Sequence, residues 1–524
     1  MRPRRRLSPV LAAWLTPLLL ALVVAHGQGP QSEAARRPAV PRLTGGEIRS
    51  QPDEASAMPQ ERHPRNPAHA ANLVRAAMAG LDWVPGEVIV KFRDELPGFT
   101  AEQLLATVLQ RERPTRFTPL GDAMLVDLEN MTDVESVVSV LRAQPEVEYA
   151  EPNYIRRLAF QPNDPQFSAQ WHLPAIGMEA AWDIAKGGTS SVTVAVIDSG
   201  LAHLTTSFEF RYWNGRSFSN VIVPFAAADD LITPGRVVSP YDYYWDDTSP
   251  VDMSRHGTHV AGTIGQLTDN GKGVAGIAYG VRLMPLKVCY SYWDVQFMAG
   301  ALGTPGWAST SQGGCPTSDT ALAIRYAADN GAKVINLSLG GSVPTSVERD
   351  ALVYAVQKGA FVAIAAGNEY EEGNPPSYPA VYAKDLDGVV AVAGVNRNLT
   401  RAWYSNTGSY VELAAPGGDT RSGSAGGVLQ QTLNTSTFAY PPSLLIAPRF
   451  DSLTYSGLQG TSMATPHVAG LAALLVSRGL TRPEAVEAAL KRFARDLGSA
   501  GRDDDYGYGL IDARATLRGL GVAR

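Results

Sequence analysis

Long apolar runs and cysteine are both scarce in this sequence, and each absence excludes a class of protein. The main apolar run is Val10–Ala25, which Pro17 interrupts. It is too short for a stable membrane span and no later window is long enough, so we expect no membrane-spanning protein. The 2 cysteines form no thiol or zinc motif. A catalytic or metal-binding cysteine is therefore not indicated.

Positive charge is too scarce for a nucleic-acid partner. The chain has 45 Lys and Arg against 51 Asp and Glu, which gives a net charge of -6. We find no basic stripe interleaved with aromatic residues and no glycine-rich phosphate loop after a strand. We therefore expect no nucleic-acid partner.

The N-terminus has the features of a secretory signal. Arg2 and Arg4–Arg6 precede the apolar run, and Ala25–Gly27 supplies small residues for cleavage. We predict that residues 1–27 are a signal peptide and that the protein is secreted, to the outside or the periplasm. An uncleaved anchor is the alternative.

Residues 28–83 are rich in Pro, Ala, Arg and Gln, and we predict a disordered leader there.

The pattern changes between residues 84 and 158, where alternating and helical periodicities follow one another. Strands are predicted first at Glu87–Arg93, then at Ala123–Leu128 and Glu146–Glu151, and helices at Ala101–Arg111 and Met131–Ala143. The order fits a small ferredoxin-like β-α-β-β-α-β module.

Residues 159–524 alternate between short apolar runs and helical segments. The strand-like runs are Val192–Ile197, Val281–Val288, Ala332–Leu337, Ala360–Ala365 and Gly388–Val395. This alternation predicts an α/β fold, with a mostly parallel sheet and helices on both faces. Two long insertions, Leu204–Asp252 and Gly423–Tyr455, are expected to be loops at the rim of a cleft.

Three reactive side chains lie at ends of predicted elements. Asp198 follows the apolar strand Val192–Ile197, His256 opens a helix of small residues, and Ser462 follows Gly460 at the start of another helix. A buried carboxylate is costly unless it is paired. A serine nucleophile needs a base, and the base needs a third group to orient it. Together the three residues predict an Asp–His–Ser catalytic triad.

Two other histidines lie one helical turn further along the same helices. We interpret His259 and His467 as packed or hydrogen-bonded helix residues rather than as bases. An isolated Gly-Thr-Ser is more often an ordinary helix start than a nucleophile. The prediction therefore depends on the three segments occurring together.

These segments resemble the signatures of the subtilisin-like (subtilase, peptidase S8) family. The matching motifs are VAVIDSG around Asp198, HGTHVAG from His256, AAGN ending at Asn368 and GTSMATPHVAG around Ser462. They occur in the family's order, Asp, His, Ser. The resemblance implies a doubly wound, subtilisin-like fold and a serine endopeptidase.

The resemblance also implies roles for individual residues. Asn368 would donate to the oxyanion. The remaining substrate-binding residues would be Ser338, Leu339 and Gly340 on an edge strand and Gly367 and Glu369 beside the P1 pocket. We expect broad cleavage after large apolar residues, with some acceptance of basic ones because of Glu369.

The module at 84–158 resembles the inhibitory propeptide of subtilases. This implies a zymogen that processes itself between Tyr154 and Gln161, with the propeptide acting as folding assistant and intramolecular inhibitor. The expected partners are protein or peptide substrates, the enzyme is expected to be a monomer, and catalysis is expected to need no cofactor.

Two structural features are expected in the enzyme domain. An even pair of cysteines in an exported chain predicts a disulfide between Cys289 and Cys315. The resemblance further suggests a structural calcium ion. Its ligands would be the side chains of Asp164 and Asn270 and the carbonyls of Leu267, Lys272 and Val274. An ordinary Asn-Gly turn is the alternative, and the family's second carboxylate is not evident because the first insertion lies there.

Three other functions fit the sequence less well. A catalytically inactive binding protein would rarely keep the triad and Asn368 together. A lipase or esterase would carry a Gly-x-Ser-x-Gly motif, whereas Ser462 has Thr and Met as neighbours. A serine-carboxyl peptidase would use a glutamate base and lack His256.

Overall fold

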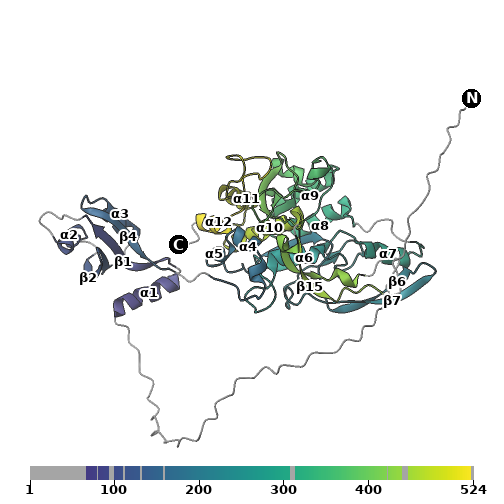
Figure 1. The fold of residues 1–524 in the computed structure, drawn as a ribbon, viewed down its shortest axis with the longest axis horizontal. Coiled ribbons are helices and arrows are strands. Elements are labelled where there is room, and N and C mark those ends of the chain that lie inside the picture. Colours follow the sequence, from purple (N-terminus) through teal and green to yellow (C-terminus); the bar gives the residue numbers. More distant parts are fainter. Residues whose placement is uncertain are drawn as a thin grey trace, which may run out of the picture. The chain divides into compact units, whose positions relative to one another are not determined.

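The structure is a computed structural model, shown in Figure 1. It describes residues 66–520 except 80, 94–99, 110–112, 130–132, 157–159, 307–312, 422 and 439–446. The predicted signal peptide and most of the predicted leader lie outside the described residues. In the described part of the chain, no helix is long and apolar enough to cross a bilayer.

The N-terminal module has the predicted β-α-β-β-α-β order. Its elements are β1 (Trp83–Phe92), α2 (Ala101–Val108), β2 (Pro114–Leu120), β3 (Ala123–Leu128), α3 (Val134–Arg142) and β4 (Val147–Tyr154). The sheet order is β2-β3-β1-β4, with every neighbouring pair antiparallel. Val88, Val126, Val138 and Leu141 form its buried core. The ferredoxin-like prediction is confirmed.

A helix lies where we expected only a disordered leader. Helix α1 (Pro67–Ala79) packs against β1. His69 Nδ1 lies 2.6 Å from Oε1 of the buried Glu87, and Asn153 Nδ2 donates to the other carboxylate oxygen at 2.7 Å. The prediction of disorder through residue 83 was therefore wrong for this helix, because a buried polar contact fixes a segment that has few large apolar residues.

The large domain contains a seven-stranded parallel sheet. The sheet order is β13-β12-β11-β10-β5-β9-β8, and all neighbouring pairs are parallel. The strands are β5 (Thr193–Asp198), β8 (Tyr241–Asp242), β9 (Arg282–Lys287), β10 (Val334–Leu337), β11 (Phe361–Ala365), β12 (Val389–Val395) and β13 (Val411–Pro416). Every residue of β5 and β10–β13 is buried, so both faces of the sheet are covered. The predicted doubly wound α/β fold is confirmed.

The helices pack around this sheet. They are α4 (His172–Ala175), α5 (Met178–Trp182), α6 (His256–Gly265), α7 (Tyr292–Ala301), α8 (Thr317–Asp329), α9 (Ser346–Gln357), α10 (Thr461–Ser477), α11 (Pro483–Arg492) and α12 (Ala513–Gly519). Short 3-10 turns occur at Phe167–Ala169, Tyr370–Glu372, Ala380–Asp385, Ser424–Gly426 and Thr435–Thr437. Helix α10 contacts β5 and β10–β13 and packs against α6 (Figure 1). The two helices predicted to carry the base and the nucleophile are thus neighbours.

Both insertions contain strands where we expected loops. The first holds a hairpin of β6 (Thr206–Trp213) and β7 (Phe218–Phe225), and the second region holds the antiparallel pair β14 (Val428–Leu433) and β15 (Leu453–Leu458). In β6, half-buried and exposed residues alternate, and Phe210 stacks on Phe297 of α7. The aromatic and polar residues of this segment alternate along the sequence, which is a pattern typical of a strand.

Buried Arg236 fixes the first insertion to the sheet domain. Its guanidinium donates to the carbonyls of Leu231 at 2.8 Å, Tyr279 at 2.9 Å and Val281 at 3.3 Å, and also to Gly265 at the end of α6. Burial lowers the pKa of Arg236 to about 10. The insertion that precedes His256 is therefore anchored by polar bonds as well as by apolar packing.

Candidate active site

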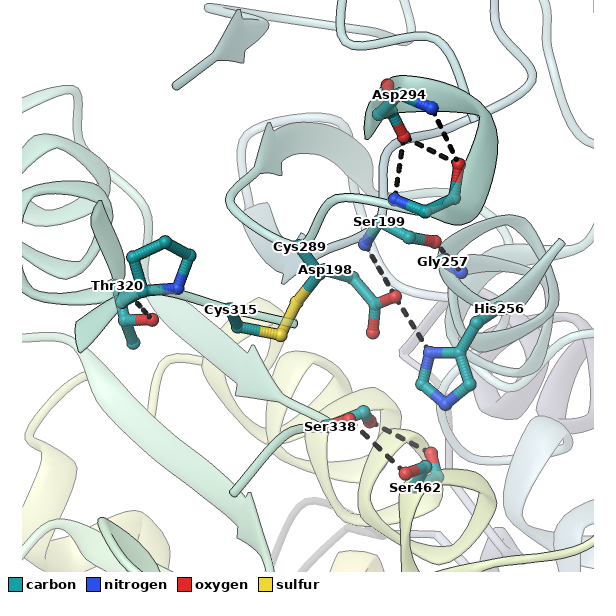
Figure 2. Close-up of a disulfide and its surroundings, with 12 residues drawn as sticks. Asp198, Ser199, His256, Gly257, Cys289, Asp294, Cys315, Thr320, Ser338 and Ser462 are labelled. Carbon is teal, nitrogen blue, oxygen red and sulfur yellow. Dashed lines mark hydrogen bonds and ion pairs between the residues drawn. A yellow bond between two sulfur atoms is a disulfide. The ribbon is translucent and has the colours of Figure 1, made fainter. Parts of the chain in front are cut away.

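Asp198 and His256 meet where β5 ends and α6 begins. Nδ1 of His256 lies 2.7 Å from Oδ1 of Asp198, which also accepts the backbone N–H of Ser199 at 2.7 Å (Figure 2). The Asp198 side chain is 2% exposed, whereas that of His256 is 33% exposed. The carboxylate thus holds one nitrogen of the imidazole and leaves Nε2 at the more open side.

A glycine makes this contact possible. A Cβ at position 257 would lie 2.2 Å from the Gly200 carbonyl and 3.1 Å from Oδ1 of Asp198. The backbone N–H of Gly257 instead donates to Ser199 Oγ at 3.0 Å. The glycine that follows His256 in the sequence therefore allows α6 to approach the end of β5.

The environment of His256 favours its protonated form. Burial lowers its pKa, whereas the negative charge of Asp198 and the hydrogen bond to it raise the pKa. Asp252 raises it further and Arg255 opposes the shift. The net pKa of His256 lies above the usual value for histidine.

Ser462 is the second residue of α10. Its Oγ donates to the Ser338 carbonyl at 3.2 Å, and Ser338 Oγ donates to the Ser462 carbonyl at 2.8 Å. Figure 2 shows the Nε2 edge of His256 pointing toward Ser462. No hydrogen bond joins these two side chains among the described residues, and such bonds are often long in substrate-free enzymes.

The Asn368 side chain is held in one orientation beside Ser462. Its Oδ1 accepts the backbone N–H of Thr461 at 2.8 Å and the Thr461 hydroxyl at 3.0 Å. Since the oxygen is occupied by the residue before Ser462, the amide nitrogen is available to donate elsewhere.

A cleft of about 390 Å³ adjoins Asp198 and His256. Its lining also includes Ser338–Gly341, Val343, Tyr378, Tyr290, Gly313, Gly314 and both cysteines. The expected disulfide between Cys289 and Cys315 is present and forms part of this wall (Figure 2). The predicted substrate residues Ser338, Leu339 and Gly340 therefore lie together beside the triad candidates.

Gly367 and Glu369 flank Asn368 and do not line that cleft. Gly367 has φ +109, and a Cβ there would lie 2.4 Å from Nδ2 of Asn406. The Glu369 carboxylate accepts the backbone N–H of Asn368 at 2.8 Å and Nδ2 of Asn406 at 3.2 Å. Its negative charge is thus held next to Gly367.

The other two histidines of the catalytic helices are buried. His259 Nε2 lies 2.9 Å from the Val428 carbonyl, and His467 Nε2 lies 2.8 Å from Nδ1 of His172. Burial lowers the pKa of His259 to about 3 and that of His467 to about 4. Both are packed helix residues, as expected.

The candidate calcium residues lie around two buried carboxylates. Oδ2 of Asp164 accepts the Asp269 N–H at 2.8 Å, while its buried Oδ1 has no hydrogen-bond partner among the described residues. Asn270 Nδ2 donates to Oδ1 of Asp230 at 2.8 Å, and Val274 N–H donates to Oδ2 at 3.2 Å. Burial raises the pKa of both carboxyl groups, and the charge of Asp230 also raises the pKa of Asp164.

Asp230 is a second buried carboxylate in this region that the sequence analysis did not assign to it. It lies inside the first insertion, 40 residues before Asn270. No lysine or arginine of the described chain pairs with Asp164 or Asp230. Among all the residues that the structure describes, there is no cluster of three or more His, Cys, Asp or Glu side chains suited to a metal. Two carboxylates, an amide and nearby carbonyls form the donor set, which is the oxygen-rich chemistry that calcium prefers.

Comparisons with known proteins cover both domains. The profile described as Subtilase family, Peptidase_S8, matches residues 189–509, and that of the Fervidolysin N-terminal prodomain matches residues 70–153. The thermophilic serine proteinase of Bacillus sp. (strain AK1) is 32% identical over 427 residues, which cover 81% of this chain and 86% of that protein.

Two further matches support the same relationship. The extracellular protease of Xanthomonas campestris pv. campestris is 34% identical over 412 residues, covering 74% of this chain and 61% of that protein. A solved protease structure from Pseudoalteromonas arctica PAMC 21717 is 31% identical with a TM-score of 0.50, and the match covers 69% of this chain and 99% of that chain.

We predict that the His256 imidazole titrates above about 6.5, the usual value. Asp198→Asn removes the charge that offsets burial, so the pKa of His256 should fall. NMR titration of the histidine rings measures the pKa of His256 in Ser462→Ala protein and in the same protein carrying Asp198→Asn. His259 and His467 serve as internal controls that stay neutral at pH 5. A wild-type His256 that titrates below the usual value would contradict this electrostatic account.

Proposed function

Because this chain belongs to the subtilase family of serine proteases, we propose that it hydrolyses peptide bonds with Asp198, His256 and Ser462. The observation that carries the proposal is the 2.7 Å contact between buried Asp198 and His256 beside the cleft. Ser462 at the start of α10 supplies the hydroxyl, and the first turn of a helix favours developing negative charge.

The proposed reaction follows the roles of a serine-protease triad. Ser462 Oγ leaves the Ser338 carbonyl, turns toward His256 Nε2, and attacks the scissile carbonyl as the imidazole takes its proton. His256 then gives that proton to the leaving amine. Asp198 keeps the Nδ1–H tautomer and stabilises the imidazolium. A water molecule then attacks the acyl-enzyme carbonyl with His256 again as the base, and the acyl group leaves Ser462 as the free acid.

We propose that the Asn368 amide and the Ser462 N–H stabilise the oxyanion. The Asn368 oxygen is fixed by Thr461, which leaves the amide NH2 as the donor. A donor that is already oriented needs no rearrangement when charge develops on the substrate.

The substrate is proposed to be an extended peptide that pairs with Ser338, Leu339 and Gly340. A large apolar P1 side chain is proposed from membership of the subtilase family, since Gly367 itself packs closely against Asn406. The carboxylate of Glu369 accepts the backbone N–H of Asn368, and its negative charge beside Asn368 makes some acceptance of Lys or Arg part of the proposal. Catalysis is proposed to use no cofactor and to occur in a monomer.

The chain carries a prodomain, and we propose that it acts as an intramolecular inhibitor. On this proposal residues 1–27 are a signal peptide, the following leader ends before α1, and a propeptide is cut away between Tyr154 and Gln161. The enzyme domain then begins near residue 159. Secretion is supported by the N-terminal basic and apolar pattern and by the disulfide.

We also propose that Asp164, Asp230 and Asn270 hold a structural calcium ion with the carbonyls of Leu267, Lys272 and Val274. The unpartnered Oδ1 of Asp164 and two buried carboxylates without a cation support it. Bound calcium would supply the missing positive charge and so stabilise the folded state.

For the catalytic proposal, we predict that Ser462→Ala abolishes self-processing. The full chain and the variant are expressed with their leaders, and the size, N-terminus and caseinolytic activity of each product are measured. Wild type should be trimmed near residue 160 and cleave casein, while Ser462→Ala stays full-length and inactive. Ser346→Ala, at an exposed serine of α9, should behave like wild type. Trimming of Ser462→Ala at the wild-type rate in purified protein would contradict the proposal.

For the calcium proposal, we predict that EDTA lowers the melting temperature measured by calorimetry on Ser462→Ala protein. Asp164→Asn should melt lower with calcium present and respond little to EDTA. Asp229→Asn is the matched control, since that exposed carboxylate pairs with Lys272 and should leave the EDTA response intact. Equal melting temperatures with and without EDTA would exclude the site.

A further inference from the structure

Asp252 is a buried carboxylate that the triad mechanism does not use. It lies four residues before His256 and is 1% exposed. No lysine or arginine forms an ion pair with it in the described part of the chain. Its oxygens instead accept hydrogen bonds from the Ser199 hydroxyl, the Thr258 hydroxyl and the backbone N–H groups of Ser254, Arg255 and Thr258. Burial raises the pKa of Asp252, and the hydrogen bonds from Thr258, Ser254 and Arg255 oppose that shift by favouring the charged form. A carboxyl group kept in this environment needs a reason beyond packing.

These bonds join the two elements that carry the acid and the base. On the acid side, Ser199 Oγ donates to Asp252 Oδ1 at 3.1 Å, and Ser199 N–H donates to Asp198. On the base side, Thr258 of α6 donates to Asp252 Oδ2 through its hydroxyl at 2.7 Å and its N–H at 3.1 Å. Figure 2 shows Ser199 between Asp198 and Gly257. The Ser199 hydroxyl also accepts the backbone N–H of Gly257.

The residue directly before His256 has an unfavourable backbone conformation. Arg255 has φ +87, in the left-handed region that non-glycine residues rarely adopt. Its N–H donates to Asp252 Oδ1 at 3.0 Å, and its carbonyl accepts the Thr432 hydroxyl at 2.5 Å. A conformation of this kind persists only where surrounding bonds hold it, and Asp252 supplies one of them.

The charges around His256 come from every element packed near it. Asp198 lies on β5, Asp252 and Arg255 precede α6, and His259 lies on its next turn, where burial keeps it neutral. Lys287 at the end of β9 lies on the Asp252 side, where its Nζ donates to the Val251 carbonyl at 3.0 Å and pairs with Asp294 at 2.6 Å. Burial lowers the pKa of His256, Asp198 raises it, Asp252 raises it further, and Arg255 lowers it.

We propose that Asp252 is a positioning residue for catalysis, which fixes the end of β5 to the start of α6 and stabilises the imidazolium through its charge. This inference rests on the proposed triad. Asp252 acts through Ser199 on Asp198 and through Arg255 and Thr258 on the helix that carries His256. It does not contact the substrate or transfer a proton.

The test compares the mature wild type with Asp252→Asn and Ser199→Ala on a chromogenic peptide, with kcat and KM measured from pH 5 to 10. Asp252→Asn should lower kcat by roughly tenfold to a hundredfold with KM little changed, since small misplacements of catalytic groups cost about this much. The acidic limb of its kcat/KM profile should move to lower pH. Ser199→Ala keeps the charge of Asp252, so it should lower kcat without moving the limb.

Asp512→Asn is the matched control, because it also removes a carboxylate that caps a helix start, in α12. It should keep wild-type kcat and the wild-type profile. An Asp252→Asn enzyme with wild-type kcat, or with reduced kcat and an unmoved acidic limb, would overturn the proposal. If Asp252→Asn does not fold, wild-type kcat in Ser199→Ala overturns it. Activity that survives in His256→Ala would instead show that the triad proposal itself is wrong.

Discussion

The hydrogen bond between Asp198 and His256 is the contact on which the site depends. It joins residues 58 apart in the chain, so both the sheet and the helix must be in place before it forms. Strand β5 lies between β10 and β9 and brings the carboxylate to the end of the sheet, where its backbone carbonyl accepts from Val288 and Cys289. Gly257 lets α6 approach so closely that any side chain there would collide with the Gly200 carbonyl. The site is thus a consequence of how a buried parallel strand and a small-residue helix meet.

One physical contrast separates the base candidate from three other histidines of the domain. His172, His259 and His467 are fully buried without a carboxylate, and burial lowers the pKa of each. His256 is also desolvated, but Asp198 reverses the direction of its shift. The same residue type is therefore kept neutral where it packs and protonatable where it faces the cleft. The carboxylate, rather than the histidine alone, makes the difference.

The sequence predicted local elements well and distant polar contacts poorly. Buried strands such as Val192–Ile197 and the β-α-β-β-α-β module were predictable because short apolar runs and amphipathic periods are local signals. Asp198, His256 and Ser462 were singled out because each ends or opens such an element. Helix α1 was missed because a buried Glu87 fixes it. Asp230 and Asp252 were missed because the contacts that tie them to other elements, with Asn270 for the first and Ser199 for the second, are made over 40 and 53 residues. No periodicity in the chain reports contacts at that separation.

The central claim is that His256 activates Ser462, and covalent labelling tests it most directly. Mature wild type and His256→Ala are treated with a fluorophosphonate, and the labelled peptide is identified by mass spectrometry over time. The account predicts one equivalent of label on Ser462 in the wild type and a rate lower by orders of magnitude in His256→Ala. Label on a different residue, or equal rates in the two proteins, would contradict it.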